Sequence, residues 1–156
     1  MTNILTKKHS EMYAGNLKIL TKTAHVAFNN GKSYLVAPIS KKIRVISVRF
    51  ACGNVAGTDS AHSTIAVYKG TLAAIVAASA AGNLTDLTSI ATKTFAAALA
   101  KGAEVDLTIT ATSADRDVDG AENAPVGLCF YGVSPGVSDA IPAGTWIVEY
   151  VDRDEE

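Results

Sequence analysis

Apolar and polar residues alternate along several short segments of this chain. The clearest alternation runs through residues 104–111, where every second side chain is apolar: Val105, Leu107, Ile109 and Ala111. A period of two places successive side chains on opposite faces of an extended chain, so one face is buried and the other is wet. This segment is therefore predicted to be a β-strand with one solvated face.

The same reasoning predicts further strands at residues 18–28, 34–37, 41–52, 64–69, 125–132 and 144–151. Pro38 is expected to end the second of them, because proline has no backbone N–H to donate to a sheet. The side chains expected to face the core are Ile46, Val48, Phe50 and Cys52; Ile65 and Val67; Leu128 and Phe130; and Trp146, Val148 and Tyr150. On the opposite face of the last strand, Ile147 and Val151 are candidates for a surface that neighbouring molecules cover.

Residues 71–102 fit the strand pattern least well. The alanine-rich runs at 72–81 and 95–100 suit a helix by propensity, but Ile75 and Val76 stand side by side and give no helical stripe. Both runs also lie between predicted strands. We therefore expect two strands in this region, joined by a connection at residues 82–92 that can hold one helical turn.

The predicted strands are separated by turns that contain Gly, Asn and Pro, without the alternating helices of a parallel sheet. This order predicts an all-β fold, an antiparallel jelly-roll-like β-sandwich over residues 16–156. Residues 1–15 are mostly polar and are expected to form an extended N-terminal arm. A chain of 156 residues needs only this one folded domain.

Charged residues make up 19% of the chain, below the roughly 25% of ordinary soluble domains. The net charge of -1 gives no long-range attraction to nucleic acid or an anionic membrane, because such partners require a clustered excess of Lys and Arg. Contacts between subunits are depleted in charged residues, so the low content of charged residues predicts a homo-oligomer or a larger assembly. The polar arm would then be held by neighbouring molecules.

The first residues lack the apolar stretch of a secretory signal. The longest apolar run, residues 72–81, is too short for a bilayer, which needs about 20 residues. We therefore expect a protein that is made and used without export and has no membrane segment. In that setting Cys52 and Cys129 are expected to be separate buried thiols rather than a disulfide or a metal site.

An acidic loop at residues 115–123 carries Asp115, Asp117 and Asp119 at alternate positions, followed by Gly120. This spacing matches the opening of an EF-hand calcium loop. The twelfth position, however, is Val126 instead of a bidentate glutamate, and strands rather than helices are predicted around the loop. A looser calcium loop over Asp115 to Glu122 stays open, beside the more common alternative of a solvated Asp-rich turn.

The loop with Asp59, Ser60, His62 and Ser63 holds the residue types of a catalytic triad. Triads are assembled from separate elements of a rigid fold, so a polar turn is the better interpretation. Neither Walker nor dinucleotide glycine spacing is present.

His9 and His25 have no metal-ligand spacing. Trp146 and Tyr150 could stack on a sugar, but an inward strand face makes them core residues. The sequence therefore predicts no catalytic, cofactor-binding or metal site, and no enzyme.

Four basic residues gather at the start of the strongest predicted strand: Lys41, Lys42, Arg44 and Arg49. Lysine at a solvated strand edge discourages unwanted strand pairing. The functional alternative is electrostatic docking on an acidic protein shell.

Residues 42–46, 67–70, 101–108 and 126–130 resemble small jelly-roll modules of tailed-bacteriophage virions. The shared pattern is a strand with a Lys69-Gly70 turn, followed by a glycine-led amphipathic strand with Gly102, Val105, Leu107 and Thr108. The similarity covers about residues 40–151. Capsid decoration proteins, head fibres and tail-fibre modules share these motifs, and the resemblance implies a homotrimer.

On this basis we expect a virion structural protein that decorates and stabilises a phage capsid as a cement protein. Its expected partners are the major capsid protein and further copies of itself, with no nucleic acid and no membrane. It would be synthesised in the host cytoplasm and lie on the capsid exterior. The alternative is a receptor- or carbohydrate-binding jelly-roll module of a tail or fibre.

Overall fold

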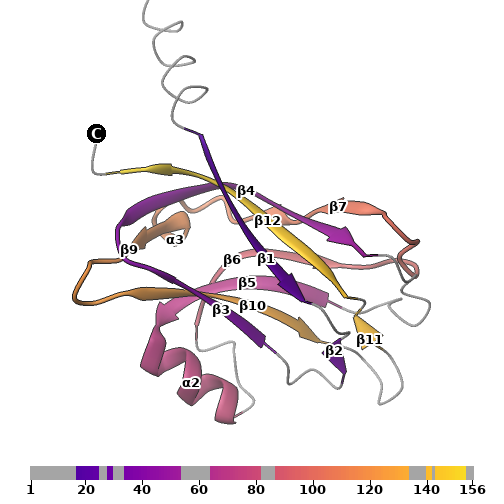
Figure 1. The fold of residues 1–156 in the computed structure, drawn as a ribbon, viewed down its shortest axis with the longest axis horizontal. Helices are drawn as coiled ribbons and strands as arrows, with labels where there is room; N and C mark the ends of the chain where they lie inside the picture. The colour runs from indigo at the N-terminus through magenta and orange to yellow at the C-terminus, as the bar shows by residue number, and fades with distance from the viewer. Residues whose placement is uncertain are drawn as a thin grey trace, which may run out of the picture.

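The computed structural model of the chain describes residues 17–24, 28–29, 34–53, 64–81, 87–133, 140–141 and 143–153. These residues form two antiparallel sheets packed face to face (Figure 1). One of them, which we call the β4 sheet, has the order β1 (Lys18–Ala24), β12 (Gly144–Asp152), β4 (Lys42–Cys52) and β7 (Glu104–Asp106), and β9 (Asp117–Asp119) also pairs with β4. The other, the β10 sheet, has the order β3 (Tyr34–Ile39), β10 (Val126–Val133), β5 (Thr64–Thr71), β6 (Thr88–Thr94) and β8 (Thr108–Ile109).

The strand pairs are nested along the chain. The first strand pairs with the last, β1 with β12, and inside this pair lie β2 (Phe28–Asn29) with β11 (Ala140–Ile141), β3 with β10, β4 with β7, and β5 with β6. Such a folded-over ribbon, wound into two antiparallel sheets, is a jelly roll. The predicted all-β, antiparallel, jelly-roll-like sandwich is confirmed.

The core between the sheets is built around three aromatic rings. Trp146, Phe50 and Phe130 have no solvent exposure, and the Trp146 ring lies 4.8 Å from Phe50 and 5.7 Å from Phe130 between ring centroids. The inward residues predicted for the strands are buried with them, except Tyr150, which is half-buried, and Ile46. Cys52 and Cys129 are free and buried, as predicted.

The prediction that Ile46 faces the core is wrong. The register between β4 and β12 shifts at this point: Ser47 pairs with Glu149 and Val45 pairs with Tyr150, so Ile46 is left over as a bulge. One extra residue exchanges the two faces of a strand. Ile43 and Val45 are therefore buried before the bulge, while Ile46 is half-buried.

The strand predicted at residues 72–81 is wrong, because these residues form the helix α2 (Leu72–Ala81). The Thr71 side-chain oxygen accepts a hydrogen bond of 3.1 Å from the Ala74 N–H, which caps the first turn. The Ile75 side chain packs against two paired glycines, Gly70 and Gly127, which leave space for it on the sheet. A Cβ on Gly127 would lie only 2.5 Å from the Ile75 Cδ1 atom. The helix thus packs on the outer side of the β10 sheet (Figure 1).

The rest of this region also differs from the prediction. The second strand is β6, which occupies part of the expected connection, and residues 95–100 are not in a strand. Pro38 does not end its strand, because β3 lies at the edge of the β10 sheet, where a missing N–H costs no ladder bond. The alternating segment 104–111 keeps its wet face but divides between sheets: β7 joins the β4 sheet and β8 the β10 sheet, with Leu107 buried between them.

No helix in the described ranges has the length and apolar character to cross a bilayer.

Candidate functional site

Several residues singled out in the sequence lie outside the described residues. These are the arm at 1–15 with His9, then His25, and the loop with Asp59, Ser60, His62 and Ser63. The remaining candidates are the acidic loop, the basic residues of β4 and the aromatic residues.

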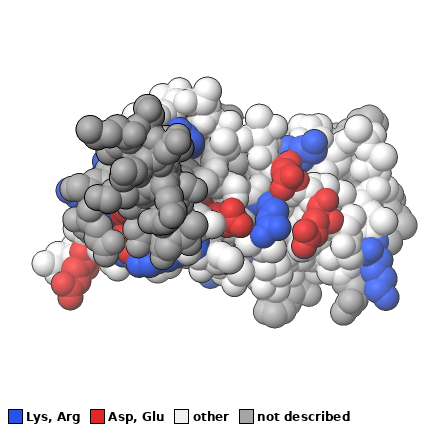
Figure 2. All heavy atoms as spheres, turned by 90° about the horizontal axis from the view of Figure 1, so that it is seen from above, with Lys and Arg blue, Asp and Glu red and all other residues white. Residues whose placement is uncertain are grey.

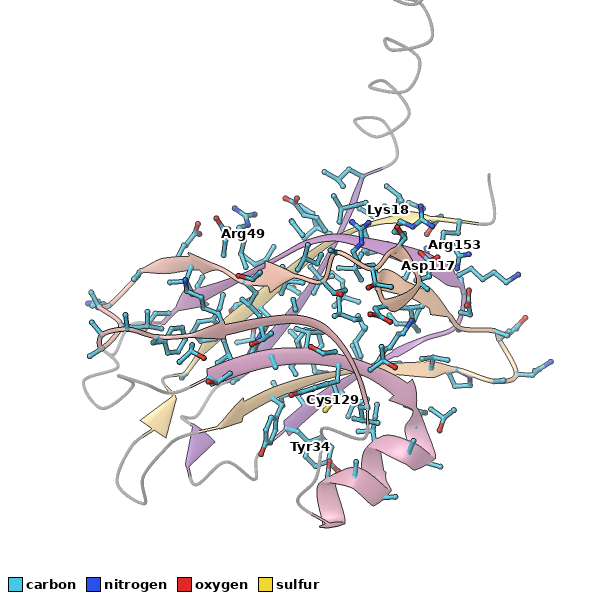
Figure 3. All side chains as sticks on the ribbon, turned by 180° about the vertical axis from the view of Figure 1, so that it is seen from behind. Lys18, Tyr34, Arg49, Asp117, Cys129 and Arg153 are labelled. Atoms are coloured by element: carbon cyan, nitrogen blue, oxygen red, sulfur yellow. The ribbon has the colours of Figure 1, made fainter. Side chains whose placement is uncertain are left out.

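The acidic loop is a short helix followed by a strand, not a wrapped ion-binding loop. Residues Ser113–Arg116 form α3, and Asp117–Asp119 form β9, which pairs with β4. The Asp117 carboxylate accepts two hydrogen bonds from the Arg44 guanidinium, 2.6 Å from Nε and 3.0 Å from Nη2. Arg153 adds a second cation, 3.5 Å from Asp117. The carboxylate is thus held by two arginines, and Figure 3 labels Asp117 and Arg153.

Gly120 also has a role other than an ion-binding turn. Its N–H donates to the Lys41 carbonyl oxygen at 3.2 Å, and a Cβ at this position would lie 1.9 Å from the Ile39 carbonyl oxygen. The glycine therefore allows two backbone segments to touch. Among the described residues, no three His, Cys, Asp or Glu side chains are grouped closely enough to hold a metal ion. The match to a calcium loop is accounted for by strand pairing and ion pairs.

The Asp117 ion pairs should make stability sensitive to acid. The hydrogen bonds from Arg44, together with the Arg153 charge, lower the pKa of Asp117 below its ordinary value. Above about pH 5 the carboxyl group is ionised in both the folded and the unfolded chain, so its stabilisation is fully present. As the pH falls further, the unfolded chain takes up the proton first and this stabilisation is lost.

We expect Asp117→Asn to be about 2 kcal/mol less stable than the wild type at neutral pH. Its free energy of unfolding should also fall less steeply than that of the wild type below about pH 4. Urea unfolding at a series of pH values measures both quantities. Equal slopes for the two proteins would contradict this role of Asp117.

Three of the four basic residues singled out here, Lys41, Arg44 and Arg49, pair with carboxylates of this chain, while Lys42 is exposed. Lys41 lies 2.8 Å from Asp152, which also pairs with Lys18, and Arg49 lies 3.6 Å from Glu149. Figure 2 shows acidic and basic side chains next to one another on the outer face of this layer. Because β4 lies between β12 and β7, the idea of a lysine-guarded edge is wrong for this strand. The predicted docking surface for an acidic shell is not a field of unpaired positive charge.

Two hollows in the described surface are small. One, of about 180 Å³, lies among Leu20, Pro38, Ile43 and Tyr150. The other, of about 230 Å³, is lined by Lys69, Thr88 and Asp119, among other residues. Pockets for small-molecule ligands usually enclose about 300–1,000 Å³. Neither hollow has the size of a typical ligand or substrate site.

The thiol of Cys129 is not a poised nucleophile. It lies under α2 with no solvent exposure, beside Ile75 and Leu87. Burial raises the pKa of the Cys129 thiol to about 12. The thiol therefore stays protonated at neutral pH, whereas a reactive cysteine needs the thiolate.

Three tyrosines form an aromatic surface that the sequence pattern did not predict. Tyr34, Tyr68 and Tyr131 come from β3, β5 and β10 and lie on the outer side of the β10 sheet, next to α2. Tyr34 pairs directly with Tyr131, and the Tyr68 and Tyr131 ring centroids are 6.5 Å apart. All three are half-buried. Each tyrosine is an odd number of residues away from the inward residues of its strand, which places it on the outer face. That the three lie together can be seen only when the pairing of the strands is known.

The aromatic and apolar candidates of β12 have other positions. Trp146 is in the core, and Tyr150 is half-buried beneath Lys41, whose ammonium lies 5.5 Å from the ring centroid. Ile147 is half-buried on the outer face of the β4 sheet. Val151 was expected on a surface for neighbours, but it is buried, with only 7% of its surface exposed. Val151 is therefore not part of an open surface.

Comparison with known proteins gives little further information. No protein-family model matches the chain, and no curated protein matches it. Among solved structures, a chain from the structure of infectious bursal disease virus Gx strain is similar, with 11% sequence identity and a TM-score of 0.37. The match covers 87% of this chain and 32% of that one, so this chain spans about a third of its length.

Proposed function

We propose that this chain is a virion structural protein that binds and stabilises an assembled phage capsid as a decoration protein. The observation that carries the proposal is the complete nested jelly-roll pairing, closed by β1 and β12. Jelly rolls occur in viral capsid proteins, in lectins and in cupins. The arrangement of the side chains favours the first of these classes.

The interior supports a structural role over an enzymatic one. A cupin-like site would need polar ligands and open space between the two sheets. In the described part of the chain this space is filled by apolar side chains, with Trp146, Phe50 and Phe130 at its centre. The fold is thus suited to presenting an outer surface.

Cementing a capsid requires no chemistry. A protein that binds only the assembled shell lowers the free energy of that shell by its binding free energy. The proposed partner is the major capsid protein, and the place of action is the capsid exterior. The small charge and the filled core fit such a surface role, as does the resemblance to phage jelly-roll modules.

The arm at residues 1–15 is the proposed anchor on the shell. Deleting it should weaken binding to capsids that lack this protein by at least ~10-fold, since the arm contacts would be lost. Co-sedimentation with such capsids measures the bound fraction. The full-length variant with Ile4→Asp and Leu5→Asp should also weaken binding, because it replaces two apolar side chains of the arm with charged ones.

Both variants should keep the thermal unfolding midpoint of the wild type, which serves as the control for folding. Undiminished binding without the arm would exclude it as the anchor. If the wild-type protein does not bind the shell, the decoration role is wrong. Binding to a glycan array instead would favour the alternative of a receptor- or carbohydrate-binding module.

The three outer tyrosines are the surface that this alternative would use. Sugar sites combine an aromatic ring with polar groups that bind the sugar hydroxyls. The side chains beside these tyrosines include the apolar Val36, Cys129 and Ile75, as well as the polar Ser89, which pairs with Tyr68. The surroundings therefore suit an apolar partner surface better than a sugar.

A further inference from the structure

The outer side of the β10 sheet, together with α2, carries no formal charge among the described residues. We call this surface the α2 face. Its outward side chains include Tyr34, Val36, Tyr68, Tyr131 and Thr92. The neighbouring Lys69 points the other way, since its Nζ donates to the Ala114 carbonyl oxygen at 2.6 Å. A surface of this extent without Asp, Glu, Lys or Arg is unusual for a side exposed to water.

The helix α2 consists of apolar residues except for Ser79. Ile75 and Ala78 face the sheet and are buried, whereas Val76 on the opposite side is 60% exposed, with Ala73 and Ala77 exposed beside it. A helix that is apolar all round is normally buried on all sides. Nothing in the described residues covers the outer side of α2, which projects from the β10 sheet in Figure 1.

The other side of the sandwich is different. The outer face of the β4 sheet carries Arg44, Arg49, Glu149 and Asp117, paired with one another or with neighbours. Figure 2 shows the charges on this side. Among the described residues, charged side chains are therefore not spread evenly: they lie on the outer face of the β4 sheet and are missing from the α2 face. Charge is depleted at the centre of subunit contacts.

We propose that the α2 face binds the α2 face of a second copy of this chain about a two-fold axis. In such a contact each residue near the axis lies close to its own counterpart. A charged centre would place like charges together, which is unfavourable. A surface without charge meets itself without this cost, so the α2 face is complementary to itself.

The dimensions of the face are sufficient for this contact. β10 and β5 have eight residues each, so they are about 26 Å long. Strands spaced about 4.8 Å apart give the described sheet a width of roughly 20 Å. This footprint, with the relief added by α2, is of the order of the ~800 Å² that each partner contributes to a standard interface.

The proposal does not depend on a capsid. It predicts an even number of copies, either a dimer or two of the trimers implied by the resemblance joined through their α2 faces. A trimer alone would leave the face uncovered.

Replacing Val76 with Lys tests the contact. The wild-type molar mass in solution should be an even multiple of the 16.2 kDa chain mass, and Val76→Lys should halve it. Two buried ammonium groups near the axis should weaken association by at least ~100-fold. Lys is a better helix former than Val, so the substitution does not weaken α2 itself. Light scattering after size-exclusion chromatography measures the mass.

The chain offers a matched control in Ile19, which is also 60% exposed but lies on β1 in the β4 sheet, opposite Glu149. Ile19→Lys should keep the wild-type mass. A wild-type mass of one or three chains would overturn the proposal, as would an unchanged mass for Val76→Lys. If the wild type is monomeric and Val76→Lys prevents capsid binding, the face is a shell contact and the proposal is wrong.

Discussion

Replacing Trp146 with Ala is expected to remove about 3–5 kcal/mol of folding free energy, out of a total of about 5–15 kcal/mol for an ordinary domain. Trp146 has no solvent exposure and contacts the rings of both Phe50 and Phe130, which come from opposite sheets. Alanine would leave a cavity at the point where the two layers meet. Neighbouring strands cannot close it without losing their register.

Urea unfolding followed by circular dichroism measures this loss. Tryptophan fluorescence is unsuitable as a probe, because the substitution removes the only tryptophan of the chain. Ile147→Ala is the matched control, since Ile147 is the next residue of β12 and lies half-buried on the outer face. It should cost about 1 kcal/mol. If Trp146→Ala were as mild as Ile147→Ala, the packing of the two sheets around this ring would be wrong.

Gly120→Ala should be the most damaging addition of a single methyl group, with a cost of about 2–3 kcal/mol. The new Cβ would lie 1.9 Å from the Ile39 carbonyl oxygen and 2.7 Å from the carbonyl carbon. These are backbone atoms, so no side-chain rotation can relieve the contact. The segment after β9 would have to move away from the connection between β3 and β4.

Gly102→Ala is the control for this substitution. Gly102 has a φ of 72°, but a Cβ added there would meet nothing within 4 Å. Alanine therefore costs only the strain of the backbone conformation, about 1 kcal/mol. Thermal and urea unfolding of both variants give the comparison. Equal destabilisation would contradict the role of Gly120 in close backbone contact.

The sequence predicted those parts of the fold in which local periodicity and burial agree. The inward residues of β5, β10 and the first part of β12 alternate regularly and could be assigned in advance, whereas Tyr150 and Val151 at the end of β12 were assigned wrongly. In β4 the assignment failed at Ile46, because a bulge depends on how β4 pairs with β12 and not on the pattern of β4 alone. A pattern within one strand cannot contain that information.

The helix α2 could not be assigned from its own pattern. Its apolar residues are not confined to one side, so the sequence shows no alternation of apolar and polar residues with the helical period of 3.6. What fixes the helix is the space above Gly70 and Gly127, two residues that are far apart in the chain and meet only when β5 pairs with β10. The local signals for a helix were the propensity of the alanine-rich run and the Thr71 cap.

The candidate surface was predictable only in part. The low charge of the chain indicated that some face is covered, but not which one. The outward residues of the β10 sheet come from separate strands, so their shared lack of charge appears only after folding. Conversely, Asp117 and Arg44 are far apart in sequence, and their pairing removed the basis for a calcium loop.

The nesting of the strands also sets an order of events during synthesis. β12, the last strand of the β4 sheet, lies between β1 and β4 rather than at an edge. β1 and β4 are made early in translation, but in the sheet they do not pair with each other, because each pairs with β12. The sandwich closes only after residues 144–152 have been made, and the slow, long-range pairing of such a topology follows from that single insertion. A partly made chain therefore lacks a closed β4 sheet, even when all strands of the β10 sheet have been made.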